Sequence, residues 1–307
     1  MKNICPKRWN SIAIESQASP LHSWEWIESK KHVGARARLF FLDDDRGQAA
    51  IPVFPMRQLK WFENRMGWIP YGLSFQGEAA YVHSHLRKFM ISNGILSLVT
   101  QSGYHANNQL LNQFRKSFSI GDDQQTFLLN LSDDTEELFK KFSNTTRKHI
   151  RRSANSGVTC EPCTDTDFEA FWPLYLDLAE TAGFAPAVSR HEFNQLIKLP
   201  LHGITDSMHL VARKAIFEDV TIGYLLTLCF GSRGLEFLRY DVRGTAVSSI
   251  APKALSWDVI KTSREVGVRC YDFGGCEPEK HAGIYQFKRG FGGELKRYGR
   301  RDVLLPL

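Results

Sequence analysis

The sequence predicts an α+β fold, an α/β sandwich in which helices alternate with strands of a mixed sheet. Residues 35–59 have the pattern of a hairpin, with an apolar strand, an acidic turn and a second strand. Residues 209–216 and 221–230 are apolar segments that predict a second hairpin. A helix over 253–267 and a buried strand over 270–275 follow, and this alternation indicates the fold class.

Other segments extend the same alternation. Residues 19–30 predict an aromatic-rich helix after a Ser-Pro turn, and 68–78 predict a loop interrupted by Pro and Gly. Residues 85–102 predict a helix, a glycine stop and a buried strand. Residues 167–184 read as a helix and 235–242 as a strand.

The middle of the chain carries the change of pattern that suggests a boundary. The segment TFLLNL predicts a strand, and Ser132 with Asp133 is expected to cap the helix that follows. A second helix is expected from Asn144 to a stop at Gly157. No Pro- or Ser-rich linker is present, so the boundary near residue 130 is predicted from this change alone, giving domains over 1–130 and 131–307.

Composition limits the class of protein. The 307 residues suit two domains of ordinary size, and 43% hydrophobic with 23% charged residues is typical of a soluble globular protein. The N-terminal residues contain no signal-peptide pattern, and no stretch reaches the roughly 18 apolar residues of a membrane helix. We therefore expect a cytoplasmic monomer without an integral membrane segment.

The cysteines and histidines give little support to a metal site. Cys160 and Cys163 have the C-x-x-C spacing, but Cys270 and Cys276 do not supply a matching second pair. His83 and His85 form a close pair whose nearest carboxylate in sequence is Glu78. We expect no metal and no cofactor. The patterns G-x-S-x-G and G-x-G-x-x-G are also absent, so a serine hydrolase and a dinucleotide enzyme lack their signatures.

The charge balance allows an anionic partner. The formal net charge is +6 and the pI about 9.0. Arg147, Lys148, Arg151 and Arg152 fall on one face of the predicted second helix, where they can neutralise phosphates. The alternative is a solvent-exposed helix face without a ligand, which is what a cluster of charged residues usually forms. The sequence leaves both open.

Single residues near the ends of predicted elements are candidates for a site. Arg190 has the forked geometry that suits carboxylate or phosphate, although an ordinary surface arginine is the simpler interpretation. Tyr240 ends an apolar strand and can aim its hydroxyl into a cleft, but packing in the core is the favoured alternative. Lys288 lies in the segment GIYQFKRGFGGE, residues 283–294. This lysine can bind phosphate, stabilise an oxyanion or simply belong to a turn, although the phosphate-loop pattern G-x-x-x-x-G-K-[ST] is absent.

Four segments in order resemble the Fem-type (FemABX) aminoacyltransferases, the enzymes that build peptidoglycan cross-bridges. They are SPLHSWEWIESKK, WIPYGLSFQGE, TFLLNLSDDTEELFKKFSNTTRKHIRRSANSGV and YDFGGCEPEKHAGIYQFKRGFGGELKRY. The last two are the more specific. The resemblance implies two tandem domains of the GNAT acyltransferase fold, each with a mostly antiparallel sheet, and a C-terminal tail that returns to the first domain.

The resemblance also implies a reaction. An amino acid would move from aminoacyl-tRNA to an amine on a peptide-bearing acceptor, such as a peptidoglycan precursor or a natural-product peptide. Lys288 takes the place of the catalytic lysine, and its ammonium would neutralise the oxyanion. Looser matches give the substrate-binding residues, which are Phe287, Tyr240, Arg190, Phe193 and Lys30. The basic helix face would then meet the tRNA.

Two other functions remain open at this stage. The first is an acyl-CoA-dependent GNAT N-acyltransferase, although the pyrophosphate loop [QR]-x-x-G-x-[GA] is not completed at Arg264 or Arg289. The second is a basic RNA-binding protein that keeps the fold without catalysis.

Overall fold

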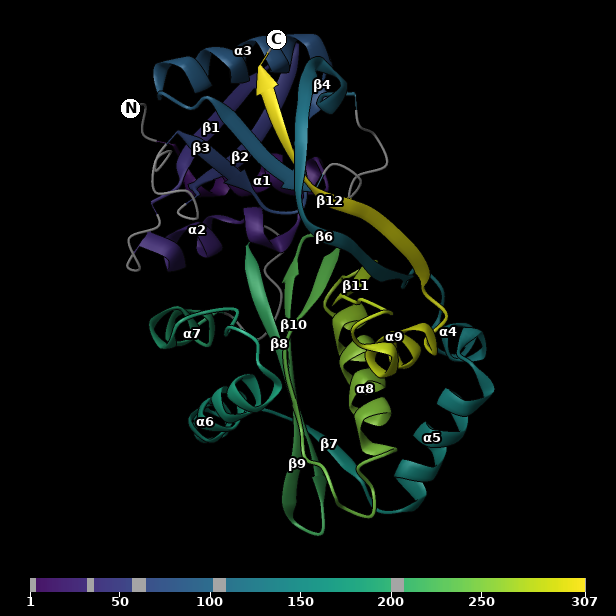
Figure 1. Ribbon diagram of the computed structural model, residues 1–307. Helices are drawn as coiled ribbons and strands as arrows, with labels where there is room; N and C mark the ends of the chain where they lie inside the picture. Colours follow the sequence, from purple (N-terminus) through teal and green to yellow (C-terminus); the bar gives the residue numbers. More distant parts are fainter. Residues whose placement is uncertain (1–3, 32–35, 57–64, 102–108, 200–206, 307) are drawn as a thin grey trace.

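The first half of the chain combines strands with the helices α1, α2 and α3 (Figure 1). The computed structural model describes residues 4–31, 36–56, 65–101, 109–199 and 207–306. The elements of this half are α1 (Pro6–Glu15), η1 (Pro20–His22), α2 (Trp24–Lys31), β1 (Arg38–Asp44), β2 (Gly47–Pro55), β3 (Met66–Ile69), β4 (Gln76–Gly77), α3 (Ala79–Ser92), β5 (Ser97–Gln101) and η3 (Leu111–Gln113).

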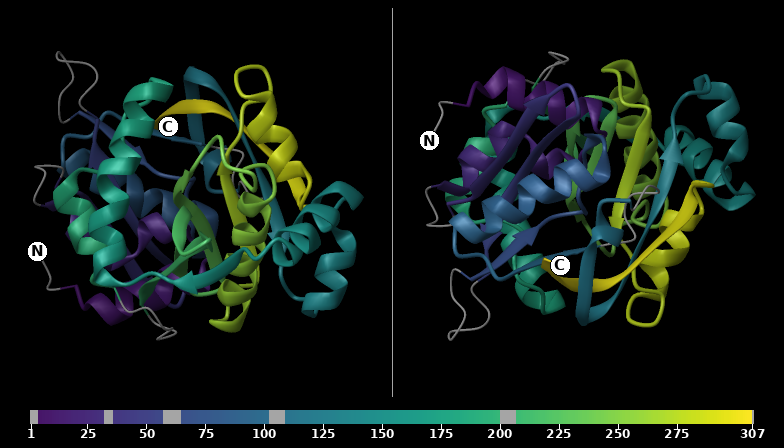
Figure 2. Two further views of the ribbon diagram at one scale, coloured as in Figure 1. Left: turned by 90° about the horizontal axis from the view of Figure 1, so that it is seen from below. Right: turned by 90° about the horizontal axis from the view of Figure 1, so that it is seen from above.

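The second half carries a larger sheet with helices on both faces. Its elements are β6 (Phe114–Asn130), α4 (Thr135–Lys141), α5 (Asn144–Asn155), β7 (Thr159–Pro162), α6 (Asp165–Ala182), α7 (Arg190–Leu196), β8 (Met208–Phe217), β9 (Val220–Phe230), β10 (Arg233–Asp241), α8 (Ala251–Glu265), β11 (Cys270–Gly275), α9 (Ala282–Arg289) and β12 (Glu294–Pro306). Helices α6 and α7 lie on one side of this sheet, and α8 and α9 lie on the other (Figure 1). Figure 2 shows α5 on the same side as α8 and α9.

Both predicted hairpins are confirmed by the strand pairing. Strand β1 pairs antiparallel with β2, and β8 pairs antiparallel with β9. In the described part of the chain, the strand order is β1-β2-β3-β5-β12-β6-β11-β10-β9-β8-β7, with β4 beside β2. The pairs β3–β5 and β10–β11 are parallel and the others antiparallel. The sheet is therefore mixed and mostly antiparallel, as predicted.

Two long strands join the halves. Strand β6 runs from Phe114 to Asn130 and pairs with β12 along most of its length. The same β12 pairs with β5 over Arg301–Leu304, so the end of the chain adds a strand to the first half. The predicted boundary at residue 130 lies at the end of β6, and it stays a prediction because both long strands serve both halves.

Two local expectations were wrong in detail. The cap of α4 is Asp134, whose carboxylate accepts hydrogen bonds from the backbone N–H groups of Glu136 and Glu137 at 2.9 Å. Ser132 and Asp133 precede the cap, and Asp133 pairs instead with Lys141. The segment 68–78 begins in β3 and ends in β4, so it is a turn between two short strands rather than a loop throughout.

The three glycines after Lys288 have separate packing reasons. A Cβ on Gly290 would lie 2.4 Å from Thr146 Oγ1, so this glycine lets the start of α5 pack on the end of α9. Gly292 has φ +71°, and its Cβ would lie 2.5 Å from Lys141 O. A Cβ on Gly293 would lie 3.0 Å from Leu128 O. Close approach of backbone and side chains thus explains the glycine-rich sequence.

We predict that Gly292→Ala destabilises the protein more than Gly299→Ala. Both positions have positive φ, but nothing lies within 4 Å of a Cβ on Gly299. The left-handed conformation should cost about 1–2 kcal/mol at each site. The contact with Lys141 should add about 1–3 kcal/mol at Gly292 alone. Urea unfolding of the two variants measures the difference, and equal losses would contradict the packing account.

Candidate active site

Lys288 lies in the last turn of α9 and is buried, with 8% of the residue exposed. Its ammonium donates hydrogen bonds to three backbone carbonyls at the end of β11. The acceptors are Phe273 O at 2.5 Å, Gly274 O at 3.1 Å and Gly275 O at 2.9 Å. These bonds use all three donors of the ammonium group. One cation therefore ties α9 to the end of β11.

The carbonyls lie where two parallel strands separate. Strands β10 and β11 pair only over Arg233–Leu235 and Cys270–Asp272, and the pairing of each with its other neighbour is irregular just beyond. Gly274, with φ +70°, occupies the gap, and a Cβ there would lie 3.1 Å from Glu236 O and 3.8 Å from Lys288 Nζ. The ammonium therefore lies where β10 and β11 stop pairing.

Two carboxylates surround this cation. Burial lowers the pKa of Lys288, and the negative charges of Glu236 and Asp272 act in the opposite direction. Asp272 is buried and accepts hydrogen bonds from Thr126 Oγ1 at 2.5 Å and from the Gly274 N–H at 2.8 Å. A desolvated positive charge in such a setting can neutralise a developing oxyanion more effectively than a solvated one.

Two tyrosines bring the first half of the chain to the same place. Tyr71 belongs to the segment WIPYGLSFQGE and Tyr298 to β12, and their ring centroids lie 6.3 Å apart. Burial raises the pKa of both phenols, and the charge of Asp272 raises them further. Tyr71 also has φ +55°, a conformation that a tyrosine rarely adopts. Two of the segments that carry the Fem-type resemblance therefore meet beside Asp272.

Phe287 faces away from these carbonyls. Its ring lines a surface cavity of about 590 Å³ between α5, α8 and α9. The Arg239 guanidinium lies 4.7 Å from the ring centroid and donates hydrogen bonds to Ser256 Oγ and Pro252 O, both at 2.8 Å. Phe287 thus separates the cavity from a buried arginine.

Tyr240 is not brought to Lys288. It packs against the apolar cluster that contains Leu235, Leu238 and Phe193, on the side of α6 and α7. Its neighbour Arg239 points to α8, because successive side chains of a strand alternate between faces. Tyr240 and Lys288 therefore belong to opposite faces of the sheet.

Lys30, Arg190 and Phe193 do gather, but each has a partner within the protein. Lys30 Nζ lies 2.6 Å from Glu192 Oε1, which joins α2 to α7. Arg190 pairs with Glu169 and lies over the Trp172 ring.

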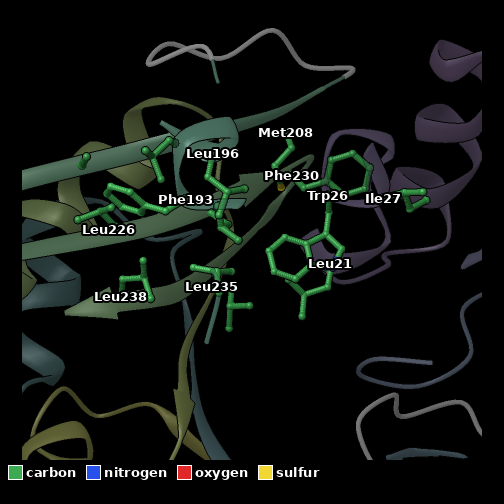
Figure 3. Packing of buried hydrophobic residues seen from close by; sticks show 14 of the residues in the cluster. Leu21, Trp26, Ile27, Phe193, Leu196, Met208, Leu226, Phe230, Leu235 and Leu238 are labelled. Atoms are coloured by element: carbon green, nitrogen blue, oxygen red, sulfur yellow. The ribbon is translucent and has the colours of Figure 1, made fainter. Parts of the chain in front are cut away.

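Phe193 is fully buried. Figure 3 shows Phe193 and Leu196 of α7 in the same apolar cluster as Trp26 and Ile27 of α2. Its ring stacks on Trp172 with centroids 4.8 Å apart. Phe193 therefore has no exposed surface that a substrate could contact, and its side chain packs α7 against α6.

The basic face of α5 is present. Lys148, Arg151 and Arg152 are exposed on this helix, while Thr146, Ile150 and Ser153 are buried. Arg147 is half-buried and donates to Lys140 O and to Asn144 Oδ1. Three of the four predicted cations are thus free to meet an anionic partner.

The two cysteines of the C-x-x-C pair are free thiols, with Cys160 partly exposed and Cys163 buried. Burial raises the pKa of Cys160 and Cys163 to about 12, which keeps these thiols protonated at neutral pH. Within the described ranges, no group of three or more His, Cys, Asp or Glu residues is arranged to hold a metal ion. In the same part of the chain, no helix is both long and apolar enough to cross a membrane.

Sequence reasoning missed several members of the site. Asp272 and Tyr71 lie inside the segments that carry the resemblance, so a closer reading of those segments would have found them. Glu236, Arg239 and Lys253 lie in an ordinary strand and at an ordinary helix start. No local pattern marks them, because only the pairing of distant strands and helices brings them to α9.

The comparisons with known proteins agree with this architecture. The FemAB family model matches residues 247–299, the segment that contains α8, β11, α9 and Lys288. This match confirms the Fem-type resemblance. No curated protein sequence matches the chain significantly.

Solved structures extend the Fem-type likeness from this segment to the whole fold. FemX shares 14% identity, with 99% of this chain and 97% of that chain covered and a TM-score of 0.77. The C-terminal domain of a putative lysylphosphatidylglycerol synthetase from Agrobacterium fabrum shares 11%, with 97% and 91% covered and a TM-score of 0.59. L-PGS from Bacillus licheniformis shares 12%, with 98% and 92% covered and a TM-score of 0.57. These likenesses confirm the predicted α+β fold.

We predict that Lys30→Met destabilises the protein by about 3 kcal/mol, because it leaves the buried Glu192 carboxylate without its cation. The double variant Lys30→Met/Glu192→Leu should recover much of this loss, since neither charge then remains buried. Chemical denaturation of the single and double variants measures the coupling. Additive losses would show that the two side chains act independently.

We also predict a pH dependence from Lys288. Since burial lowers its pKa below the usual 10.5, the folded protein releases this proton at lower pH than the unfolded chain does. The free energy of unfolding should therefore rise with pH between the lowered pKa and 10.5, and the rise should be missing in Lys288→Gln. Urea unfolding at several pH values above neutrality measures it. Parallel profiles for the two proteins would contradict the buried ammonium.

Proposed function

We propose that the protein is an aminoacyltransferase that forms a peptide bond between the amino acid of an aminoacyl-tRNA and an amine of a peptide-bearing acceptor. The observation that carries the proposal is the buried ammonium of Lys288, held by backbone carbonyls where the pairing of β10 with β11 ends. It lies in the segment that the FemAB family model matches. The likeness to FemX over the whole fold supports the same class of transferase, with a peptidoglycan precursor or a natural-product peptide as acceptor.

The chemistry needs a stabilised oxyanion. The neutral amine attacks the ester carbonyl, a C–N bond forms, and the carbonyl oxygen becomes negatively charged. When the C–O bond to the ribose breaks, the proton lost by the amine passes to the ribose oxygen, so the reaction balances without an added base. The Lys288 ammonium neutralises the carbonyl oxygen in the intermediate.

The three carbonyl contacts of Lys288 fit this role. Phe273 O and Gly274 O accept the two buried hydrogen bonds, while the bond to Gly275 O is partly buried and Gly275 is exposed. The substrate oxygen would replace Gly275 O as the third acceptor. The other two carbonyls would keep the ammonium in place during the exchange.

We predict that Lys288→Gln lowers the rate of transfer from aminoacyl-tRNA by about 10²–10³, the usual effect of removing one oxyanion donor. Glutamine keeps two N–H donors for the carbonyls but carries no charge, so the fold should survive. Lys296→Gln, a change of the same kind in β12, is the control and should transfer at the wild-type rate. Retained activity in Lys288→Gln would remove Lys288 from the mechanism.

The donor is tested by offering a mixed pool of radiolabelled aminoacyl-tRNA and a panel of acyl-CoA compounds with candidate amines. Transfer from the tRNA pool that ribonuclease pretreatment abolishes is the expected result. Transfer from acyl-CoA alone would contradict the proposed donor, and a protein that binds RNA with neither activity would favour the non-catalytic alternative.

A further inference from the structure

The cavity beside Phe287 is lined by positively charged and neutral polar groups. Its walls come from the start of α5 (Ser143 and Thr145), from Lys253 in the first turn of α8, and from α9, which contributes Phe287 and Arg289. No aspartate or glutamate is among its described lining residues. An open cavity of about 590 Å³ with this lining suits an anionic group larger than a free ion.

The two cations of this cavity lack acidic partners. Lys253 is half-buried, donates a hydrogen bond to Thr146 Oγ1 at 3.0 Å, and has its pKa lowered by burial. Arg289 is exposed at the rim. Within the described residues, no carboxylate forms an ion pair with either side chain, whereas nearby Lys140 and Lys280 are both paired. Two uncompensated cations that share one cavity indicate an anionic ligand.

The helix α5 begins at the cavity, because Thr145 lines it and Lys253 donates a hydrogen bond to Thr146 Oγ1. His149, on that helix, has its pKa lowered first by burial and then by the positive charges of Lys253, Arg152 and Lys148. The same imidazole therefore lies near the cavity lysine and near two exposed cations of α5. The positive surface is longer than one phosphate group requires.

One wall of the cavity is aromatic. The Phe287 ring is half-buried, and Lys253 Nζ lies 6.0 Å from its centroid. Such a ring can contact a ribose or a base while the cations hold the adjoining phosphate. On its other side the Phe287 ring contacts Arg239, whose charge also acts on Lys288, so the cavity and the buried ammonium lie on either side of this arginine.

We propose that this cavity binds the phosphate of the nucleotide next to the transferred acyl group, with Lys253 and Arg289 as its cationic ligands and Phe287 as its stacking wall. The inference rests on the proposed function, which supplies the donor. Arginine offers a fork of donors and lysine a point charge, a combination that suits phosphate oxygens. The extension along α5 favours the single-stranded 3′ end of an RNA over the pyrophosphate of CoA, although both present the same chemistry.

The test is a binding measurement with defined probes. A fluorescent RNA hairpin that ends in single-stranded CCA is titrated with the protein, in parallel with the same hairpin without the overhang. The variants are Lys253→Gln, Arg289→Gln and the double variant. Lys88→Gln, an exposed lysine of α3, is the control that removes the same charge elsewhere. Thermal unfolding of each variant checks that the fold is kept.

We expect each cavity variant to bind the CCA hairpin about tenfold more weakly, the effect of losing one hydrogen bond to a charged group. The salt dependence should also decrease, by about 0.7 in the slope of log K against log salt for each phosphate that is no longer neutralised. The cavity variants should bind the blunt hairpin as the wild type does. Lys88→Gln should bind both hairpins with wild-type affinity. In transfer assays the KM for aminoacyl-tRNA should rise while kcat is kept.

The other outcomes separate the cavity from the proposed function. Wild-type affinity for the CCA hairpin in the double variant would overturn the cavity assignment, while tRNA-dependent transfer by the wild type would leave the proposed function standing. If the wild type binds CoA but no RNA, and the double variant loses CoA, the phosphate site is supported and the tRNA donor is contradicted.

Discussion

The pairing of β6 with β12 is the constraint on which the rest of the structure depends. These strands run through both halves of the sheet, with β11 beside one end of β6 and β5 beside the far end of β12. Because β12 begins just after α9, the same pairing fixes where α9 ends and where Tyr298 meets Tyr71. Segments that are more than two hundred residues apart thereby form one site.

The site itself depends on a buried cation whose donors are satisfied by backbone. Removing an ammonium from water is costly unless it is hydrogen-bonded, and the three carbonyls at the end of β11 supply those bonds. The pairing of β10 with β11 ends at Asp272, so beyond it the carbonyls of Phe273, Gly274 and Gly275 accept hydrogen bonds from the lysine. The same three carbonyls thus fix α9 on β11 and fix the position of the ammonium that the proposed reaction needs.

Much of the local structure was predictable from sequence. Local apolar patterns predicted the strands of both hairpins and the helices α5 and α8. Each of these patterns lies within a single helix or strand, so it can be recognised without knowing the tertiary structure. The length of β6 and the whole of β12 escaped prediction, since their polar, glycine-interrupted sequences become strands only by pairing with each other. Among the site residues, Lys288 came from the family resemblance. The burial of Phe193 against Trp172 of α6, and the face on which Tyr240 lies, depend on tertiary packing that no local pattern encodes.

The central claim is that Lys288 stabilises the tetrahedral intermediate and not merely the bound substrate. It is tested most directly by comparing two inert donor analogues: an RNA end with an amide in place of the ester, and one with a tetrahedral phosphonate. An interaction made only in the transition state should strengthen the binding of the phosphonate analogue and leave the binding of the amide analogue almost unchanged. We expect Lys288→Gln to bind the phosphonate analogue about 100-fold more weakly than wild type does, with little change for the amide. Equal changes for both analogues would contradict the account.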